Sequence, residues 1–167
     1  MKKLSQWCAL AFFVAALLFA GSARAKDEPK PQKISASAIQ IVPVQSDEVK
    51  IPAEFQMALY EHLIEELQKS GKFQHVYRDG DKAASDSADV ITLRGNVTGF
   101  KQGSERKRQV TTVSGATSIT IHCQFVDRSG AVKLERDITG KVRFLGGNLR
   151  ATYDFAKKVT KVVDESF

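Results

Sequence analysis

The sequence contains little cysteine and only one long apolar run. Its two cysteines are Cys8 and Cys123, and Cys8 lies in an N-terminal segment that we expect to be removed. Cys123 then has no partner for an internal disulfide, which excludes a disulfide-knotted domain. After residue 25 no apolar stretch approaches the roughly 20 residues of a membrane-spanning helix. The composition, 43% hydrophobic and 26% charged, is that of an ordinary globular protein.

The one apolar run has the pattern of an export signal. Lysines at positions 2 and 3 precede the apolar residues 7–20, and small residues at Ala23 and Ala25 form a signal-peptidase site. A lipoprotein would need a cysteine just after the run, whereas Cys8 stands near its start. We therefore expect residues 1–25 to be a cleaved signal peptide, with no lipid and no integral membrane anchor. The protein would be periplasmic or secreted.

Charge is distributed unevenly along the remaining chain. Loss of Lys2, Lys3 and Arg24 lowers the net charge from +6 to +3. Residues 26–93 carry 8 basic and 12 acidic side chains, whereas residues 94–167 carry 14 and 7. A basic half favours anionic partners, and in an exported protein we expect these to be envelope components rather than nucleic acid. An ordinary solvated surface explains the same distribution.

Residues 26–33 read as a flexible leader, and 34–167 as a single domain. Within it, Pro52 opens a helix that Gly71 ends, because apolar residues recur every four positions between them. Asn148 is expected to cap a second amphipathic helix that continues towards the C-terminus. Predicted strands cover residues 34–44, 73–77 and 90–100, a segment ending near 126 with a bulge at Gly115, and the segment from 132 to 144.

The later strands alternate between apolar and polar side chains, which is typical of a sheet covered on one side only. Two amphipathic helices are available to cover it. The predicted fold is α+β: a two-layer sandwich of a mixed, mostly antiparallel sheet with two helices on one face. The predicted order is β-α-β-β-β(-β)-α, the extra strand depending on a bulge at Gly115.

Several segments resemble the domain-of-unknown-function 4410 family of exported bacterial envelope proteins. They are Ser70-Gly71-Lys72-Phe73 after the first helix, the strand over 89–100, the turn at 127–130, and Gly146-Gly147 before the last helix. The resemblance covers about residues 34–165. It implies an architecture similar to the amino-terminal domain of TolB and to the outer-membrane activators of penicillin-binding proteins. Many relatives are lipoproteins, a feature that this chain lacks. The family implies no catalytic residues.

No catalytic or metal-binding constellation is visible in the sequence. His122 and Cys123 are adjacent, but neighbouring side chains on a strand point to opposite faces, so they cannot form a nucleophile–base pair. We expect Cys123 to be a buried core residue. The other histidines, His62 and His75, are dispersed and lack the spacing of metal ligands. We therefore predict no catalytic residues, no metal and no cofactor.

The basic triplet Arg106-Lys107-Arg108 falls in a predicted turn at one end of the sheet, where loops often carry function. Candidate partner-binding residues are these three together with Arg94, His122 and Arg143 on the polar sheet face. The sequence thus favours a non-catalytic binding or assembly module of the cell envelope, whose partner is an envelope protein or an anionic envelope component. Small-ligand or lipid binding, or a hydrolase with an unrecognised site, remain the alternatives.

The first testable prediction concerns export. We expect cleavage after Ala25, so the mature chain should begin at Lys26. Intact-mass measurement of the protein from a periplasmic fraction checks this directly. Retention of Met1, or recovery of the protein in the inner-membrane pellet, would show that the segment is not a cleaved signal.

Overall fold

The computed structural model describes residues 33–111, 115–143 and 146–167. The predicted signal peptide, the leader up to residue 32 and Phe144 lie outside the described residues. Within the described ranges, no helix has the length and apolar character needed to cross a membrane. The described residues belong to one compact unit, Pro31–Phe167.

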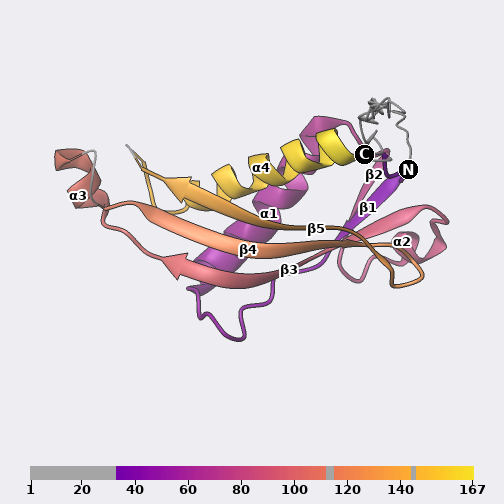
Figure 1. The fold of residues 1–167 in the computed structure, drawn as a ribbon, viewed down its shortest axis with the longest axis horizontal. Coiled ribbons are helices and arrows are strands. Elements are labelled where there is room, and N and C mark those ends of the chain that lie inside the picture. Colours follow the sequence, from indigo (N-terminus) through magenta and orange to yellow (C-terminus); the bar gives the residue numbers. More distant parts are fainter. Residues whose placement is uncertain (1–32, 112–114, 144–145) are drawn as a thin grey trace, which may run out of the picture. The chain divides into compact units, whose positions relative to one another are not determined.

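Five strands form one mixed sheet in the order β2-β1-β3-β4-β5 (Figure 1). The short β1 pairs in parallel with β2 and β3, and the longer β3, β4 and β5 pair antiparallel. The elements in chain order are β1 (Ala38–Ile41), α1 (Ala53–Ser70), β2 (His75–Arg78), α2 (Lys82–Asp86), β3 (Val90–Lys101), α3 (Glu105–Val110), β4 (Thr117–Val126), β5 (Val132–Val142) and α4 (Arg150–Ser166). The predicted two-layer α+β class is confirmed. The predicted cap at Asn148, the predicted bulge at Gly115 and the predicted turn that carries residues 106–108 need correction.

Helix α1 forms as its sequence predicts. Pro52 precedes its first residue, and Gly71 ends it in a left-handed conformation with φ of 64°, which glycine adopts without strain. The apolar stripe is buried against the sheet, and its largest members are Phe55, Leu59, Leu63 and Leu67. The opposite face is solvated.

Helix α4 packs beside α1 on the same face of the sheet (Figure 1). Its apolar side chains are buried, and Phe167 packs against Phe73 and Phe125, with ring centroids 5.5 and 5.6 Å apart. The predicted cap at Asn148 is wrong, because the N-cap residue of this helix is Leu149, whose side chain makes no capping hydrogen bond. The Asn148 side-chain oxygen instead accepts hydrogen bonds from Arg108 of α3 and Thr117 of β4.

The predicted bulge at Gly115 is also wrong. Gly115 precedes β4, and the register shifts instead in β3 between Val97 and Gly99. This irregularity turns Phe100 towards the core, where its ring lies 5.0 Å from that of Phe55. Strict alternation along β3 would place Gly99 on the core face and Phe100 on the polar face, but a bulge reverses the facing of the residues that follow it.

The other face of the sheet is polar, with one part covered. The short helix α2 lies over β1, where Ala84 and Ala38 are both buried. Arg128 fixes this helix by donating to the backbone oxygens of Ser85 and Ser87. The segment between β2 and β3 therefore contains a short helix. The polar face of the sheet is open over β3, β4 and β5 but not over all of β1.

The contact between α4 and β5 generates a stability prediction. A Cβ at Gly140 would overlap the backbone oxygen of Ala151 and the Cβ of Phe155. We expect Gly140→Ala to lower the free energy of unfolding by about 2 kcal/mol, because neither neighbour can move without displacing the helix. Urea unfolding measures the change.

Gly99→Ala is the matched control on β3. Its added Cβ would meet Thr120 Cβ at 3.6 Å, an ordinary contact, so the free energy of unfolding should change by less than about 1 kcal/mol. Equal effects of the two substitutions would contradict the close packing of α4 on β5.

Candidate functional site

The structure separates the six sequence-based candidates into three places. Arg106, Lys107 and Arg108 lie on α3, Arg94 and His122 lie together on the polar sheet face, and Arg143 follows β5. The predicted turn that carries the triplet is the six-residue helix α3, which Ser104 begins by accepting a hydrogen bond from the Lys107 backbone N–H. These groups form different kinds of surface.

Arg108 is not an exposed loop residue, because only 4% of it is accessible to solvent. Its Nη1 donates to Gly115 O at 2.6 Å and to Thr117 Oγ1 at 3.3 Å. Its Nη2 donates to Gly146 O at 2.8 Å and to Asn148 Oδ1 at 2.9 Å. No carboxylate among the described residues bonds to this guanidinium. Arg108 therefore joins the segment before β4 to the segment before α4. Because it is buried, it is a structural residue and not a partner-binding residue.

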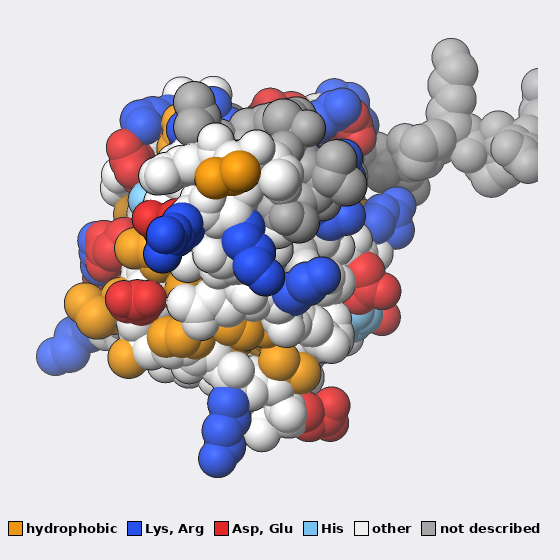
Figure 2. Space-filling view, turned by 90° about the vertical axis from the view of Figure 1, so that its left-hand side faces the viewer, with side chains coloured by type: hydrophobic (Ala, Val, Ile, Leu, Met, Phe, Trp, Pro, Cys, Tyr) orange, Lys and Arg blue, Asp and Glu red, His pale blue; other side chains and the backbone are white. Residues whose placement is uncertain are grey.

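Arg106 and Lys107 are exposed, as predicted for the whole triplet. Figure 2, which views the end of the protein that carries α3, shows Lys and Arg side chains gathered around the middle of this end. The three adjacent basic residues of the sequence thus divide into one structural cation and two that face solvent.

Arg143 lines a groove of about 430 Å³ between the end of β5 and the start of α4. Lys141, Arg150 and Lys157 line the same groove, together with Tyr153. The Lys157 ammonium lies 4.6 Å from the centre of the Tyr153 ring, a favourable cation–π distance. The sequence had placed Arg143 on the open sheet face, but here it belongs to the basic end of the molecule.

Arg94 and His122 line a hollow of about 470 Å³ on the open face. It lies over β3 and β4, beside the segment that links β1 to α1. Its lining comprises Val42, Pro43, Gln45, Asp79, Arg94, Gly95, Asn96, His122 and Gln124. The strand pairing explains the arrangement, because Arg94 stands opposite Gln124 and Asn96 opposite His122 in the antiparallel β3–β4 ladder.

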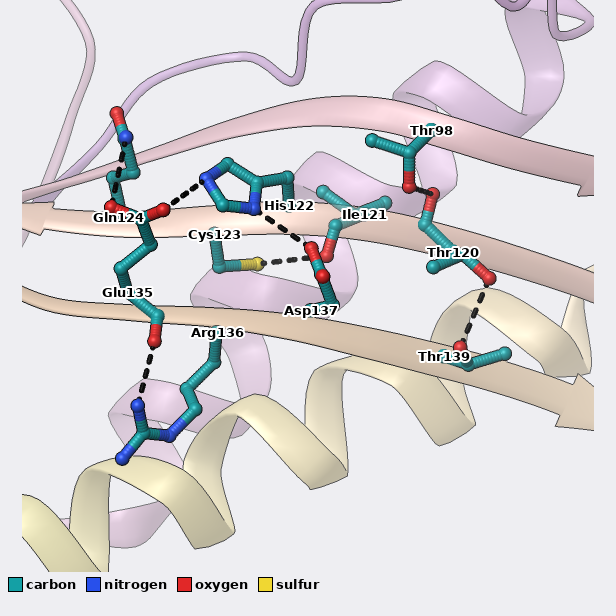
Figure 3. A network of polar contacts seen from close by, with 10 residues as sticks. All are labelled: Thr98, Thr120, Ile121, His122, Cys123, Gln124, Glu135, Arg136, Asp137 and Thr139. Carbon is teal, nitrogen blue, oxygen red and sulfur yellow. Dashed lines mark hydrogen bonds and ion pairs between the residues drawn. The ribbon is translucent and has the colours of Figure 1, made fainter.

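Carboxylates hold the His122 ring from both sides (Figure 3). Nδ1 lies 2.7 Å from Asp137 Oδ1, and Nε2 lies 3.0 Å from Glu135 Oε1. Gln124 also donates to Glu135, at 3.4 Å. Both ring nitrogens are therefore engaged by side chains of β5, which fix the position of the ring.

Two polar groups in the hollow lack protein partners. Asn96 Oδ1 is buried and accepts no hydrogen bond within the described residues. The guanidinium of Arg94 is exposed and forms no ion pair with any carboxylate of the described residues. Buried polar atoms are nearly always paired, so the Asn96 oxygen is an acceptor that a donor from outside the described residues would satisfy. Asn96 is half-buried, and only the tertiary structure shows that its side-chain oxygen is buried and without a partner among the described residues.

The adjacent Cys123 points to the opposite face of β4, as predicted. It is 1% exposed, and its thiol donates weakly to Ile121 O at 3.8 Å. Burial, with a smaller effect of Asp137, raises the pKa of the Cys123 thiol to about 12. Such a thiol is a poor nucleophile, and it cannot reach the hollow. Within the described residues, no three His, Cys, Asp or Glu side chains are placed to hold a metal ion.

These features define a class of protein: an α+β domain whose sheet leaves one polar face uncovered. The chain belongs to the family described as Domain of unknown function (DUF4410), whose model matches residues 22–142. The resemblance found in the sequence is therefore confirmed. No curated protein sequence matches the chain.

Solved structures share the fold. The PelC dodecamer from Paraburkholderia phytofirmans is 16% identical, with a TM-score of 0.57 over 78% of this chain and 88% of that chain. A point variant of the same dodecamer is 15% identical, with a TM-score of 0.55 over 78% of this chain and 87% of that chain. At these identities the likeness shows the arrangement of helices and strands alone.

The buried guanidinium of Arg108 generates the third prediction. We expect Arg108→Met to lower the free energy of unfolding by about 3 kcal/mol, because it removes the donors that the guanidinium supplies to the Gly115 and Gly146 oxygens and one of the two donors to the Asn148 oxygen. Lys107→Met, the same change on an exposed neighbour, should alter it by less than about 0.5 kcal/mol. Urea unfolding of both variants makes the comparison, and equal midpoints would contradict the structural role of Arg108.

Proposed function

We propose that this protein is a non-catalytic binding or assembly module of the bacterial cell envelope, reaching the periplasm through its N-terminal signal. The observation that chiefly supports the binding role is the hollow on the open sheet face, with the unpaired Arg94 guanidinium and the unpaired Asn96 oxygen. Polar groups without protein partners on a rigid sheet are suited to recognition.

The chemistry of the hollow favours binding over bond cleavage. Arg94 is a permanent cation that offers several N–H donors and no base. His122 is held by Glu135 and Asp137, and the thiol of Cys123 lies on the other face of the strand. Hydrolysis by a nucleophile would require a base within hydrogen-bond reach of it. The hydrolase alternative thus receives no support from this arrangement.

The same groups indicate the ligand chemistry. A carboxylate, phosphate or carbonyl oxygen on the partner would accept from Arg94. A hydroxyl or amide N–H would donate to Asn96 Oδ1. An envelope protein or an anionic envelope component supplies both kinds of group. Core side chains, among them Phe55, Phe125 and Phe155, fill the layer between helices and sheet, so a small ligand would also bind on the outer face.

Self-assembly is a second candidate, supported by the dodecameric state of the PelC structures that share this fold. Side chains already occupy part of the outer edge of β5. Asp154 accepts from the Lys141 backbone N–H, and Lys158 donates to Thr139 O. Edge groups satisfied in this way resist pairing with another strand. The short β2, at the other edge of the sheet, is therefore the better candidate for contact with a second copy.

The test places a photo-crosslinking amino acid at Gln124, which lines the hollow. In living bacteria we expect a discrete crosslinked product, reduced about tenfold by Arg94→Ser, because a lost charged hydrogen bond is worth roughly 1.5–3 kcal/mol. Electrophoresis and mass spectrometry measure the yield and identify the product. A product of twice the chain mass would support self-assembly.

Arg136→Ser is the matched control. Arg136 is an exposed arginine on the neighbouring strand β5, and its side chain donates to Glu135 O on its own strand (Figure 3). Its replacement should leave the crosslink unchanged. A crosslink that survives Arg94→Ser, or that Arg136→Ser reduces as strongly, would contradict the role of the hollow.

A further inference from the structure

One end of the domain gathers positive charge from three separate parts of the chain. Lys101 and Lys107 line a hollow of about 490 Å³ beside α3, and the basic groove beside α4 lies at the same end. Arg108 joins the two parts by bonding to Gly115 and to Gly146. We name this surface the basic pole, and its exposed cations are Lys101, Arg106, Lys107, Lys141, Arg143, Arg150 and Lys157.

The charge of the basic pole is poorly neutralised. Two carboxylates lie among its cations, and both bond to backbone groups. Glu105 Oε1 accepts from Asn148 N at 2.9 Å, and Asp154 Oδ2 accepts from Lys141 N at 2.8 Å. In the part of the chain that the structure describes, Arg106 and Lys107 form no ion pair. Arg106 and Lys107 therefore carry charge that no carboxylate of the described residues neutralises, and the two carboxylates among the cations are already bonded to backbone groups.

The basic pole also exposes apolar side chains. Val110, the last residue of α3, is 81% exposed, and Leu149, before α4, is 38% exposed. Figure 2 shows an exposed hydrophobic side chain close to several Lys and Arg side chains on this end. Charge alone suits any polyanion, whereas cations around a protruding apolar side chain suit the boundary between lipid headgroups and acyl chains.

We propose that the basic pole binds the surface of an anionic lipid bilayer, with Val110 inserted among the headgroups. Each lysine or arginine near such a surface strengthens the association, and burial of the valine side chain strengthens it further. The inference is independent of the hollow on the sheet face and goes beyond the proposed binding function.

This orientation leaves the rest of the domain accessible. The C-terminus lies at the end opposite α3 (Figure 1). The first part of the described chain lies beside it, because Ile34 N donates to Ser166 O at 2.8 Å. A domain standing on its basic pole would therefore hold both ends of the described chain away from the bilayer.

Vesicle sedimentation tests the proposal with the chain as recovered from cells, with an identical N-terminus in every variant. The probes are vesicles of phosphatidylglycerol with phosphatidylcholine, and of phosphatidylcholine alone. We expect binding to the anionic vesicles only, and weaker binding at high salt, because exposed charges are screened beyond about 10 Å at 0.1 M. Equal binding to both compositions, or none to the anionic vesicles, would overturn the proposal.

Three variants, with Arg108 intact and each checked for a wild-type urea midpoint, separate the contributions. Arg106→Ser/Lys107→Ser should weaken vesicle binding about thirtyfold, and Val110→Ser at least about fivefold. The control Lys33→Ser/Lys82→Ser removes two exposed cations away from the basic pole and should have little effect.

Two results would overturn the bilayer as the partner. One is an equal loss of vesicle binding in the Lys33→Ser/Lys82→Ser control, which would show that net charge alone matters. The other is unchanged binding of Val110→Ser together with tight, salt-sensitive binding to a soluble acidic polysaccharide. That outcome would assign the basic pole to an anionic polymer instead.

Discussion

Burial of one sheet face beneath two helices is the constraint on which this domain depends. Helix α4 approaches β5 closely at Gly140, where any side chain would collide with the helix backbone. Helix α1 packs beside it, and together they cover the apolar side chains of the sheet. Because the helices lie on one side, the other face of β3 and β4 must present polar groups to solvent or to a partner.

The buried Arg108 is the second organising interaction. A guanidinium removed from water costs free energy unless its donors are bonded, and here four hydrogen bonds join the two Nη atoms to neutral oxygens, while Nε has no partner among the described residues. These bonds hold α3 and the segment before α4 together at one end of the sheet. The exposed Arg106 and Lys107 are thereby brought near the cations of α4, which are some 40 positions away in sequence.

The two candidate surfaces have different chemistry. The hollow on the open face is small and polar, and fixed side chains such as His122 shape it, which suits recognition of a defined group. The basic pole is broad, positively charged and locally apolar around Val110, which suits a surface rather than a single molecule. The two proposed roles are compatible, because the hollow lies on the sheet face and the basic pole lies at one end of the domain.

The sequence by itself determined the elements that depend on periodic patterns. Four-residue spacing and Gly71 defined α1, and strict alternation placed Cys123 inside and His122 outside, because helix and strand geometry fix which side chains share a face. The family resemblance was also visible in the sequence, in the segments at 70–73, 89–100, 127–130 and 146–147. Arg94 and His122 were likewise assigned correctly to one polar face.

Only the tertiary structure decided what depends on contacts between distant segments. Asparagine is a residue that commonly caps helices, yet the side-chain oxygen of Asn148 accepts hydrogen bonds from Arg108 and Thr117 instead. The bulge in β3 turns Phe100 towards the core, and the local sequence pattern did not predict this bulge. The sequence does not distinguish the three basic residues Arg106, Lys107 and Arg108. Only Arg108 is buried, because oxygens of residues 115–148 accept hydrogen bonds from its guanidinium. Local pattern fixes the direction of a side chain, whereas its burial and its partners are set by segments that only folding brings together.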